Sequence, residues 1–118
     1  MKNILIVEDE EDIRNSLGNR LNMRGYNCEL AKDGIQALRI LSVLKCDLVI
    51  TAHRMAKLDG EGLVKMMAEN DNLRAIPVIC ITWDFSVPAK QFPLPVTVIQ
   101  KPINFQGLLQ TLQALLNS

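Results

Sequence analysis

Residues 47–60 read DLVITAHRMAKLDG, in which an apolar run passes through a turn into the start of a helix. The apolar run at 48–50 predicts a strand that is buried on both faces of a sheet. Asp59 stands where a helix N-cap is expected, so a helix should begin directly after it. This strand–turn–helix unit places Ala52 at or just after the carboxyl end of a buried strand.

Strand and helix patterns alternate outward from this unit along the chain. Apolar runs predict further strands at residues 4–7, 27–31, 76–82 and 96–99. Apolar side chains three or four residues apart predict helices around these strands, and the stripe in residues 105–116 is among the clearest. Strict alternation implies a parallel sheet with helices on both faces, and right-handed crossovers leave few topologies for it.

The composition is that of a folded and electrically balanced chain. The 118 residues fit one domain, and 48% of them are hydrophobic. Lys+Arg and Asp+Glu both number 13, so the net charge of zero gives no reason to expect nucleic-acid or membrane binding. No apolar run suits a membrane span or a signal peptide. Three cysteines without paired spacing are expected to be reduced core thiols of a cytoplasmic protein: Cys28, Cys46 and Cys80.

Residues 83–95 break the alternation. They stand where a helix should join two strands, yet they contain three prolines, which block a regular helix. We expect an irregular or extended connection with at most one helical turn. The stretch also holds Trp83, Phe85 and Phe92. Two interpretations of these aromatic residues stay open: they cover core that the missing helix would have covered, or they form a partner-binding patch.

Polar residues follow the predicted strands at the edge where open parallel sheets bind ligands. The residues at or just after the carboxyl ends of the strands are Glu8, Asp9, Ala52, Thr82 and Lys101. Each has an ordinary explanation when taken singly, such as an acidic helix start or a strand-end hydroxyl. Their convergence at one edge therefore carries the prediction of a site. Adjacent residues of a strand point to opposite faces, so His53 is expected to stay outside this site.

Short segments along the chain match one known family in combination and in order. They are ILIVEDE at 4–10, AKDG at 31–34, DLVI at 47–50, Arg54-Met55, LDG at 58–60, IPVI at 76–79 followed by Thr82, and Lys101-Pro102. The whole chain thus resembles the receiver domain of bacterial two-component response regulators. The resemblance implies one receiver-like domain over residues 1–118 with a flavodoxin-like doubly wound fold. Its five parallel strands would lie in the order 2-1-3-4-5, with the fourth helix degenerate or replaced by a proline-rich loop.

The resemblance also implies a role for each residue at the sheet edge. In the family, a histidine kinase passes its phosphoryl group to an aspartate at the end of the third strand, which is the position of Ala52. The two acidic residues that help to hold Mg²⁺ match Glu8 and Asp9, and the backbone carbonyl that contacts the same metal would be that of Arg54. The hydroxyl that bonds the phosphoryl oxygen and the lysine that pairs with its charge match Thr82 and Lys101.

The chain departs from the family pattern at the acceptor position itself. The methyl group of Ala52 cannot form an aspartyl phosphate, and the Mg²⁺ site loses a negative ligand, so its affinity should fall. Lys101 could then pair with Asp9 without a metal. Two further departures, Ala56 in place of the usual proline and the lack of an aromatic residue in 96–100, favour natural divergence of the site.

The expected function is that of a stand-alone receiver-like module that acts by contact with a signalling partner, either a histidine kinase or a downstream effector. The sequence shows no nucleophile–base pair, so we do not expect an enzyme. The resemblance implies no cofactor beyond weakly held Mg²⁺. One alternative is an ordinary phosphorelay receiver with an engineered Asp→Ala at position 52, which the genomic codon would reveal. The other is a small flavodoxin-like cofactor binder, which the acidic segment 8–11 disfavours because it would repel phosphate.

Overall fold

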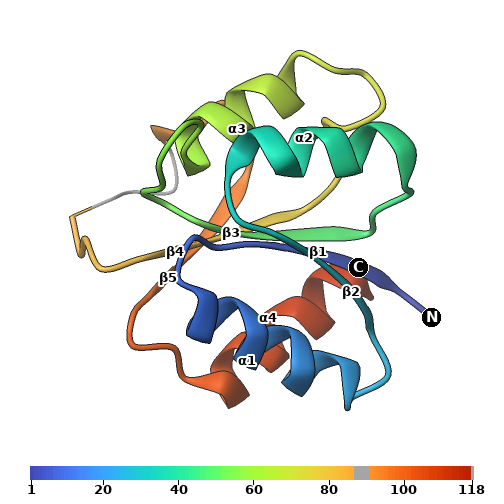
Figure 1. The fold of residues 1–118 in the computed structure, drawn as a ribbon, viewed down its shortest axis with the longest axis vertical. Coiled ribbons are helices and arrows are strands. Elements are labelled where there is room, and N and C mark those ends of the chain that lie inside the picture. Colours follow the sequence, from blue (N-terminus) through green and yellow to red (C-terminus); the bar gives the residue numbers. More distant parts are fainter. Residues whose placement is uncertain (87–90, 118) are drawn as a thin grey trace.

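Five strands form one parallel sheet in the order β2-β1-β3-β4-β5, which confirms the expected topology. The structure is a computed structural model that describes residues 1–86 and 91–117 (Figure 1). The strands are β1 Asn3–Val7, β2 Asn27–Ala31, β3 Leu48–Ala52, β4 Val78–Thr82 and β5 Val96–Gln100. The helices are α1 Glu11–Asn22, α2 Gly34–Val43, α3 Gly60–Ala68 and α4 Phe105–Leu116.

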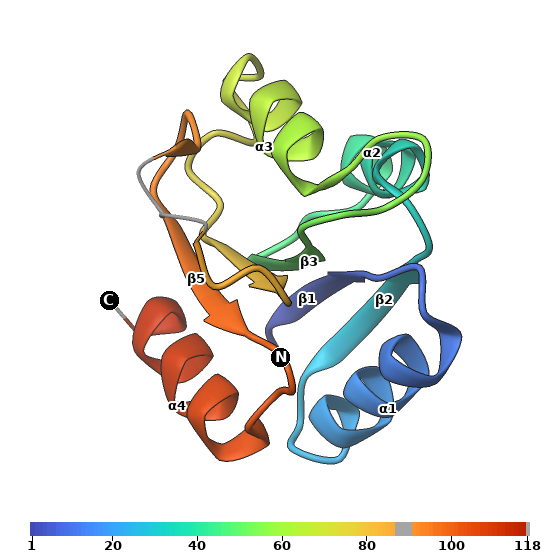
Figure 2. The same cartoon turned by 90° about the vertical axis from the view of Figure 1, so that its left-hand side faces the viewer.

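Helices cover both faces of the sheet, and each face has its own apolar core. Figures 1 and 2 show α2 and α3 on one face and α1 and α4 on the other. Strand alternation divides the buried side chains between the two cores: Leu5 and Val49 pack toward α2 and α3, whereas Ile6 and Ile50 pack toward α1 and α4. The central strands are therefore apolar on both faces, which is why they read as continuous hydrophobic runs.

The helix ends follow local signals in the sequence. Asp33, Asp59 and Asn104 each accept a hydrogen bond from the backbone N–H three residues later, at the starts of α2, α3 and α4 respectively. Past the end of α1, Gly25 adopts a positive φ of 92°, and Tyr26 N–H bonds back to the carbonyl of Leu21. Within residues 1–86 and 91–117, no helix is long and apolar enough to cross a membrane.

The connection from β4 to β5 contains no α-helix in its described parts, residues 83–86 and 91–95. Phe92 is buried and Leu94 packs against the core on the face of α2 and α3. These two side chains cover apolar surface next to β4 and β5. The expected irregular connection is thus observed for these residues, while Pro88 lies outside the described part of the chain.

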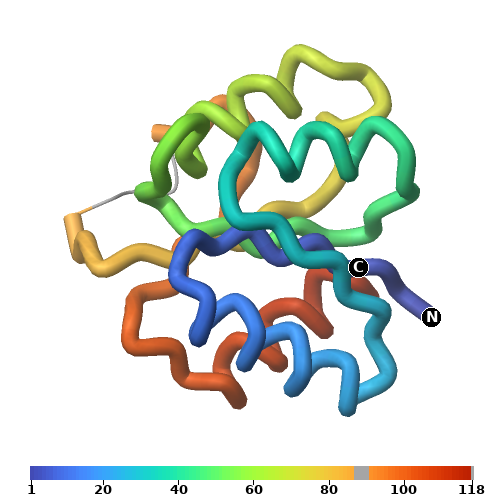
Figure 3. Tube along the Cα trace, viewed as in Figure 1, coloured from blue at the N-terminus to red at the C-terminus, as the bar shows by residue number. Residues whose placement is uncertain are grey.

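The strand register brings the carboxyl ends of the central strands to one edge. Val7 pairs with Thr51 across β1 and β3, Ala52 pairs with Ile81 across β3 and β4, and Thr82 pairs with Gln100 across β4 and β5. The turns that follow β1 and β3 lie at the same end of the sheet, at the left of Figure 3, whereas the chain begins at the right. Side chains far apart in the sequence therefore meet at the left-hand end.

Candidate functional site

A pocket of about 320 Å³ lies at this edge of the sheet. The residues that line it come from the ends of β1, β3, β4 and β5: Asp9, Glu10, Ala52, His53, Arg54, Ile81, Thr82, Trp83, Asp84 and Lys101. Of the residues that the sequence singled out for a phosphoryl and metal site, all but Glu8 line the pocket. Glu8 is only 2% exposed and pairs with one of the lining residues.

Lys101 is paired with Glu8 inside the protein. Its Nζ lies 3.0 Å from Glu8 Oε1 and 3.9 Å from Glu10 Oε1, and the side chain is 6% exposed. The prediction that Asp9 would be its partner is therefore wrong. The reason is local: Glu8 N–H still bonds to the Ala31 carbonyl, so the extended chain runs one residue past β1. Alternation then sends Glu8 inward, on the same side as Ile6, and leaves Asp9 exposed.

Both oxygens of the Glu8 carboxylate contact protein groups. Besides Lys101, it accepts a hydrogen bond of 3.1 Å from Glu10 N–H through Oε2. Burial raises the pKa of Glu8 above its ordinary value of 4.5, although the Glu10 N–H and Lys101 both act to lower it. The ion pair thus balances charge in a site where an unpaired carboxylate would be costly.

The side chain at position 52 contributes no oxygen donor to a Mg²⁺ site at this edge. The ion requires a compact set of oxygen ligands. Both oxygens of Glu8 already have protein partners, and position 52 offers a methyl group. Within the described ranges, no three His, Cys, Asp or Glu side chains are grouped so that they could hold a metal. Arg54 is exposed and lines the pocket together with the carboxylates of Asp9, Glu10 and Asp84.

His53 lines the pocket, contrary to the expectation that it would stay outside. Strand pairing extends to it, because His53 N–H bonds to the Ile81 carbonyl, and its ring lies toward Glu61 of α3 and Phe92, yet the residue still borders the pocket at the end of the strand. The ring is 4% exposed, with Nε2 2.7 Å from Glu61 Oε1 and Nδ1 3.3 Å from Thr82 Oγ1. Thr51 is also buried, and its hydroxyl donates a hydrogen bond to the neighbouring Ala52 carbonyl.

Thr82 is bonded on two sides at the end of β4. Its Oγ1 lies near His53 and accepts a hydrogen bond of 2.9 Å from Asp84 N–H. Asp84 in turn accepts hydrogen bonds from the hydroxyl and the N–H of Ser86, and these bonds lower its pKa. Glu61 and Asp84 were not singled out from the sequence. An acidic residue in a first helical turn is common, and no spacing rule links positions 53 and 61.

The three aromatic residues of the connection separate in the structure. Trp83 and Phe85 are 59% and 68% exposed, whereas Phe92 is 7% exposed and meets the His53 ring edge-on at 6.2 Å. The Trp83 ring lies 5.8 Å from Lys101 Nζ, so it borders the pocket. Phe92 thus belongs to the core, and only Trp83 and Phe85 present an aromatic surface.

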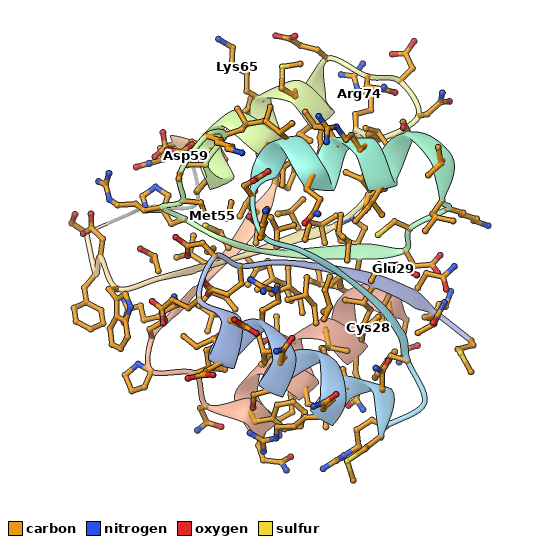
Figure 4. All side chains as sticks on the ribbon, viewed as in Figure 1. Cys28, Glu29, Met55, Asp59, Lys65 and Arg74 are labelled. Atoms are coloured by element: carbon orange, nitrogen blue, oxygen red, sulfur yellow. The ribbon has the colours of Figure 1, made fainter. Side chains whose placement is uncertain are left out.

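The cysteines are free thiols with raised pKa values. Burial, with a smaller contribution from Glu29, raises the pKa of Cys28 to about 11, and Figure 4 shows these two side chains near each other on β2. Burial raises the pKa of Cys80 to about 12, and that of Cys46 is raised by the same cause. Metal binding and disulfide exchange both require thiolate, so these residues are not a reactive site.

The thiols should therefore react slowly in the folded protein. At pH 8 roughly one Cys28 side chain in a thousand would be thiolate, and fewer at Cys80. We expect Ellman's reagent to modify all three cysteines rapidly in urea and only slowly in native buffer. A thiol that reacts equally fast in both conditions would contradict the burial described here.

The comparisons with known proteins agree with the fold. A family model described as the response regulator receiver domain matches residues 4–113. The chain is 32% identical to the response regulator MprA of Mycobacterium sp. (strain KMS) over 117 residues, which is 96% of this chain and 50% of MprA. The chain thus spans about half the length of this relative.

Solved receiver structures superpose closely on this chain. The signal receiver domain of a signal transduction histidine kinase from Syntrophus aciditrophicus matches with a TM-score of 0.90 and 31% identity, covering 99% of this chain and 91% of that one. The receiver domain of the sensor histidine kinase PA1611 from Pseudomonas aeruginosa PAO1 matches with a TM-score of 0.90 and 26% identity, covering 99% and 98%. That protein holds a magnesium ion in its active site cleft.

Proposed function

Because this chain belongs to the response regulator receiver domain family, we propose that it is a receiver-like signalling module that acts by protein–protein contact and takes no phosphoryl group at position 52. Receiver domains are signalling modules of two-component systems. The finer proposal concerns the way this one works, and it rests on the chemistry of a single position. Ala52 lines the pocket at the end of β3, where the family's aspartate would stand.

The surroundings of Ala52 support this proposal. A phosphoryl-accepting site needs a nucleophile, a hard cation and donors for the charge that develops on the transferred group. Ala52 offers no nucleophile, and the carboxylate of Glu8 is already paired with Lys101. The positive charge that would meet a phosphoryl group is therefore balanced within the protein. In such a module the Glu8–Lys101 pair keeps the charges of the pocket balanced without a bound metal.

The exposed aromatic surface is the part of the pocket rim best suited to a partner. Trp83 and Phe85 combine large apolar area with exposure above one half, and aromatic side chains concentrate the binding energy of interfaces. The partner we propose is a signalling protein, either a histidine kinase or a downstream effector. The three cysteines are free rather than paired in disulfides, which suits a reducing compartment, and we place the module in the cytoplasm.

Incubation with acetyl phosphate and Mg²⁺, followed by intact-mass measurement, tests the proposal. We expect no phosphoryl adduct on the chain, because no carboxylate stands at position 52. A covalent phosphate on the purified protein, tied to a change in its behaviour, would overturn the proposal.

The matched control is Ala52→Asp under the same conditions. An adduct on this variant and none on the parent would show that residue 52 alone prevents phosphoryl acceptance. That result would favour the alternative that Ala52 is an engineered substitution. No adduct on either protein would assign the loss to the Glu8–Lys101 pair as well. Trp83, the single tryptophan, gives a second readout because it borders the pocket: its emission should respond to Mg²⁺ less in the parent than in Ala52→Asp.

A further inference from the structure

A chain of hydrogen bonds runs from α3 through the pocket wall to the connection after β4. Glu61 on α3 contacts His53 Nε2 at 2.7 Å, and His53 Nδ1 lies 3.3 Å from Thr82 Oγ1. Thr82 Oγ1 then accepts from Asp84 N–H at 2.9 Å. The contacts therefore link α3 to the first described residues of the β4–β5 connection, which carry Trp83 and Phe85.

The other described end of the connection meets the same pair of residues. Gln91 donates a hydrogen bond from its side-chain amide to Glu61 Oε1, the atom that also contacts His53. Phe92 packs edge-on against the His53 ring, with centroids 6.2 Å apart. Both described parts of the connection are thus held by contacts that lead to the side chains of His53 and Glu61.

The direction of these hydrogen bonds follows from their chemistry. A carboxylate only accepts, so the proton on a neutral His53 ring must sit on Nε2, facing Glu61. Nδ1 is then an acceptor, and the Thr82 hydroxyl donates to it while its oxygen receives Asp84 N–H. The hydroxyl proton of Thr82 is consequently directed toward His53.

We infer that His53 positions Thr82 and anchors both described ends of the β4–β5 connection to α3, which sets the placement of the exposed Trp83–Phe85 surface. An acceptor group that entered the pocket and took the Thr82 hydroxyl proton would break the hydrogen bond between Thr82 and His53 Nδ1. Binding in the pocket would therefore remove one contact of the ring that holds the β4–β5 connection. The relevance of this anchor to signalling rests on the proposed function, in which the surface of Trp83 and Phe85 contacts the partner.

Amide hydrogen exchange measured by NMR tests the anchor directly. In His53→Leu we expect exchange about 2- to 10-fold faster at the amides of Asp84 and Ser86 and also at those of Gln91, Phe92 and Leu94, since each lost hydrogen bond contributes about 1 kcal/mol. Glu61→Leu should have the same effect at both ends. Glu61→Gln keeps an oxygen acceptor for Nε2–H and should stay close to the parent, a difference that a packing role alone would not produce.

The matched control is Glu69→Leu, an exposed position directly after the last residue of α3, which should leave both ends unchanged. The inference fails if a folded His53→Leu exchanges like the parent at both ends. If His53→Leu does not fold, Glu61→Leu decides, because its side chain is 49% exposed and its loss leaves the core intact. The measurement needs neither phosphate nor partner, so its failure is distinct from the appearance of a phosphoryl adduct.

Discussion

Replacing Glu8 by alanine is expected to lower the free energy of unfolding by about 3–5 kcal/mol, because a buried ammonium is left without its closest partner. Lys101 is 6% exposed, and its remaining carboxylate, that of Glu10, lies at 3.9 Å. Urea denaturation of the variant and the parent gives the difference. Glu29→Ala is the control, since this carboxylate is exposed on β2 and should cost little.

Two further variants separate charge from packing at the same site. Glu8→Leu combined with Lys101→Met removes both charges and should recover much of the stability lost by Glu8→Ala. A Glu8→Ala protein as stable as the parent would mean that Lys101 finds a substitute partner or water at no cost. That result would contradict the assignment of Glu8 as the counter-ion of the pocket.

The same carboxyl group should leave a signature in the pH dependence of stability. Burial raises the pKa of folded Glu8 above 4.5, so the folded state holds this proton more tightly than the unfolded state. Its contribution to stability is therefore greatest below the unfolded pKa and falls as the pH rises through the folded pKa. Glu8→Gln cannot ionise, and its stability should lack this decline on the acidic side of neutrality.

Gly60→Ala is expected to destabilise the fold by about 1–3 kcal/mol through overpacking where α3 meets the end of β3. A β-carbon at Gly60 would clash with the backbone carbonyl oxygen of Ala52 and lie 3.1 Å from the Cα of His53. Backbone atoms cannot rotate away as a side chain can. The helix start would have to shift, and Glu61 would shift with it, so thermal melting should show a lower midpoint.

Gly107→Ala is the matched control for this substitution. It lies in the first turn of α4, where an added β-carbon would find its nearest neighbours, atoms of Asn104, at 3.8 Å. We expect it to stabilise the protein by about 0.5–1 kcal/mol, because glycine costs that much in a helix. Equal effects of the two substitutions would show that the close approach of α3 to β3 is unimportant.

Most of the fold was predictable because its determinants are local or periodic. The run at 48–50 and the apolar stripe of residues 105–116 marked a buried strand and an amphipathic helix, and both are present. Asp59 was correctly predicted as the cap of α3. Alternation of strands and helices then determined the parallel sheet, since few connected arrangements satisfy it.

The partners within the site were not predictable in the same way. The sequence placed Glu8, Asp9 and Lys101 at one edge, but the choice of Glu8 over Asp9 as the partner of Lys101 depends on one extra residue of extended chain. His53 was wrongly excluded because alternation decides the face on which a side chain lies, and a residue at a strand end can border the pocket from either face. Its N–H still bonds to Ile81 of β4, and only the packed structure shows that its ring lies between Glu61 and Thr82.

The sequence by itself determined the order of elements, the edge at which the site forms and the absence of an acceptor at position 52, because side-chain identity and hydrophobic period do not depend on distant neighbours. Only the tertiary structure decided that Lys101 pairs with Glu8 and that His53 joins Glu61 to Thr82. Such pairings depend on distances of a few ångströms between separate strands and helices, and these distances exist only after the sheet and its helices have packed.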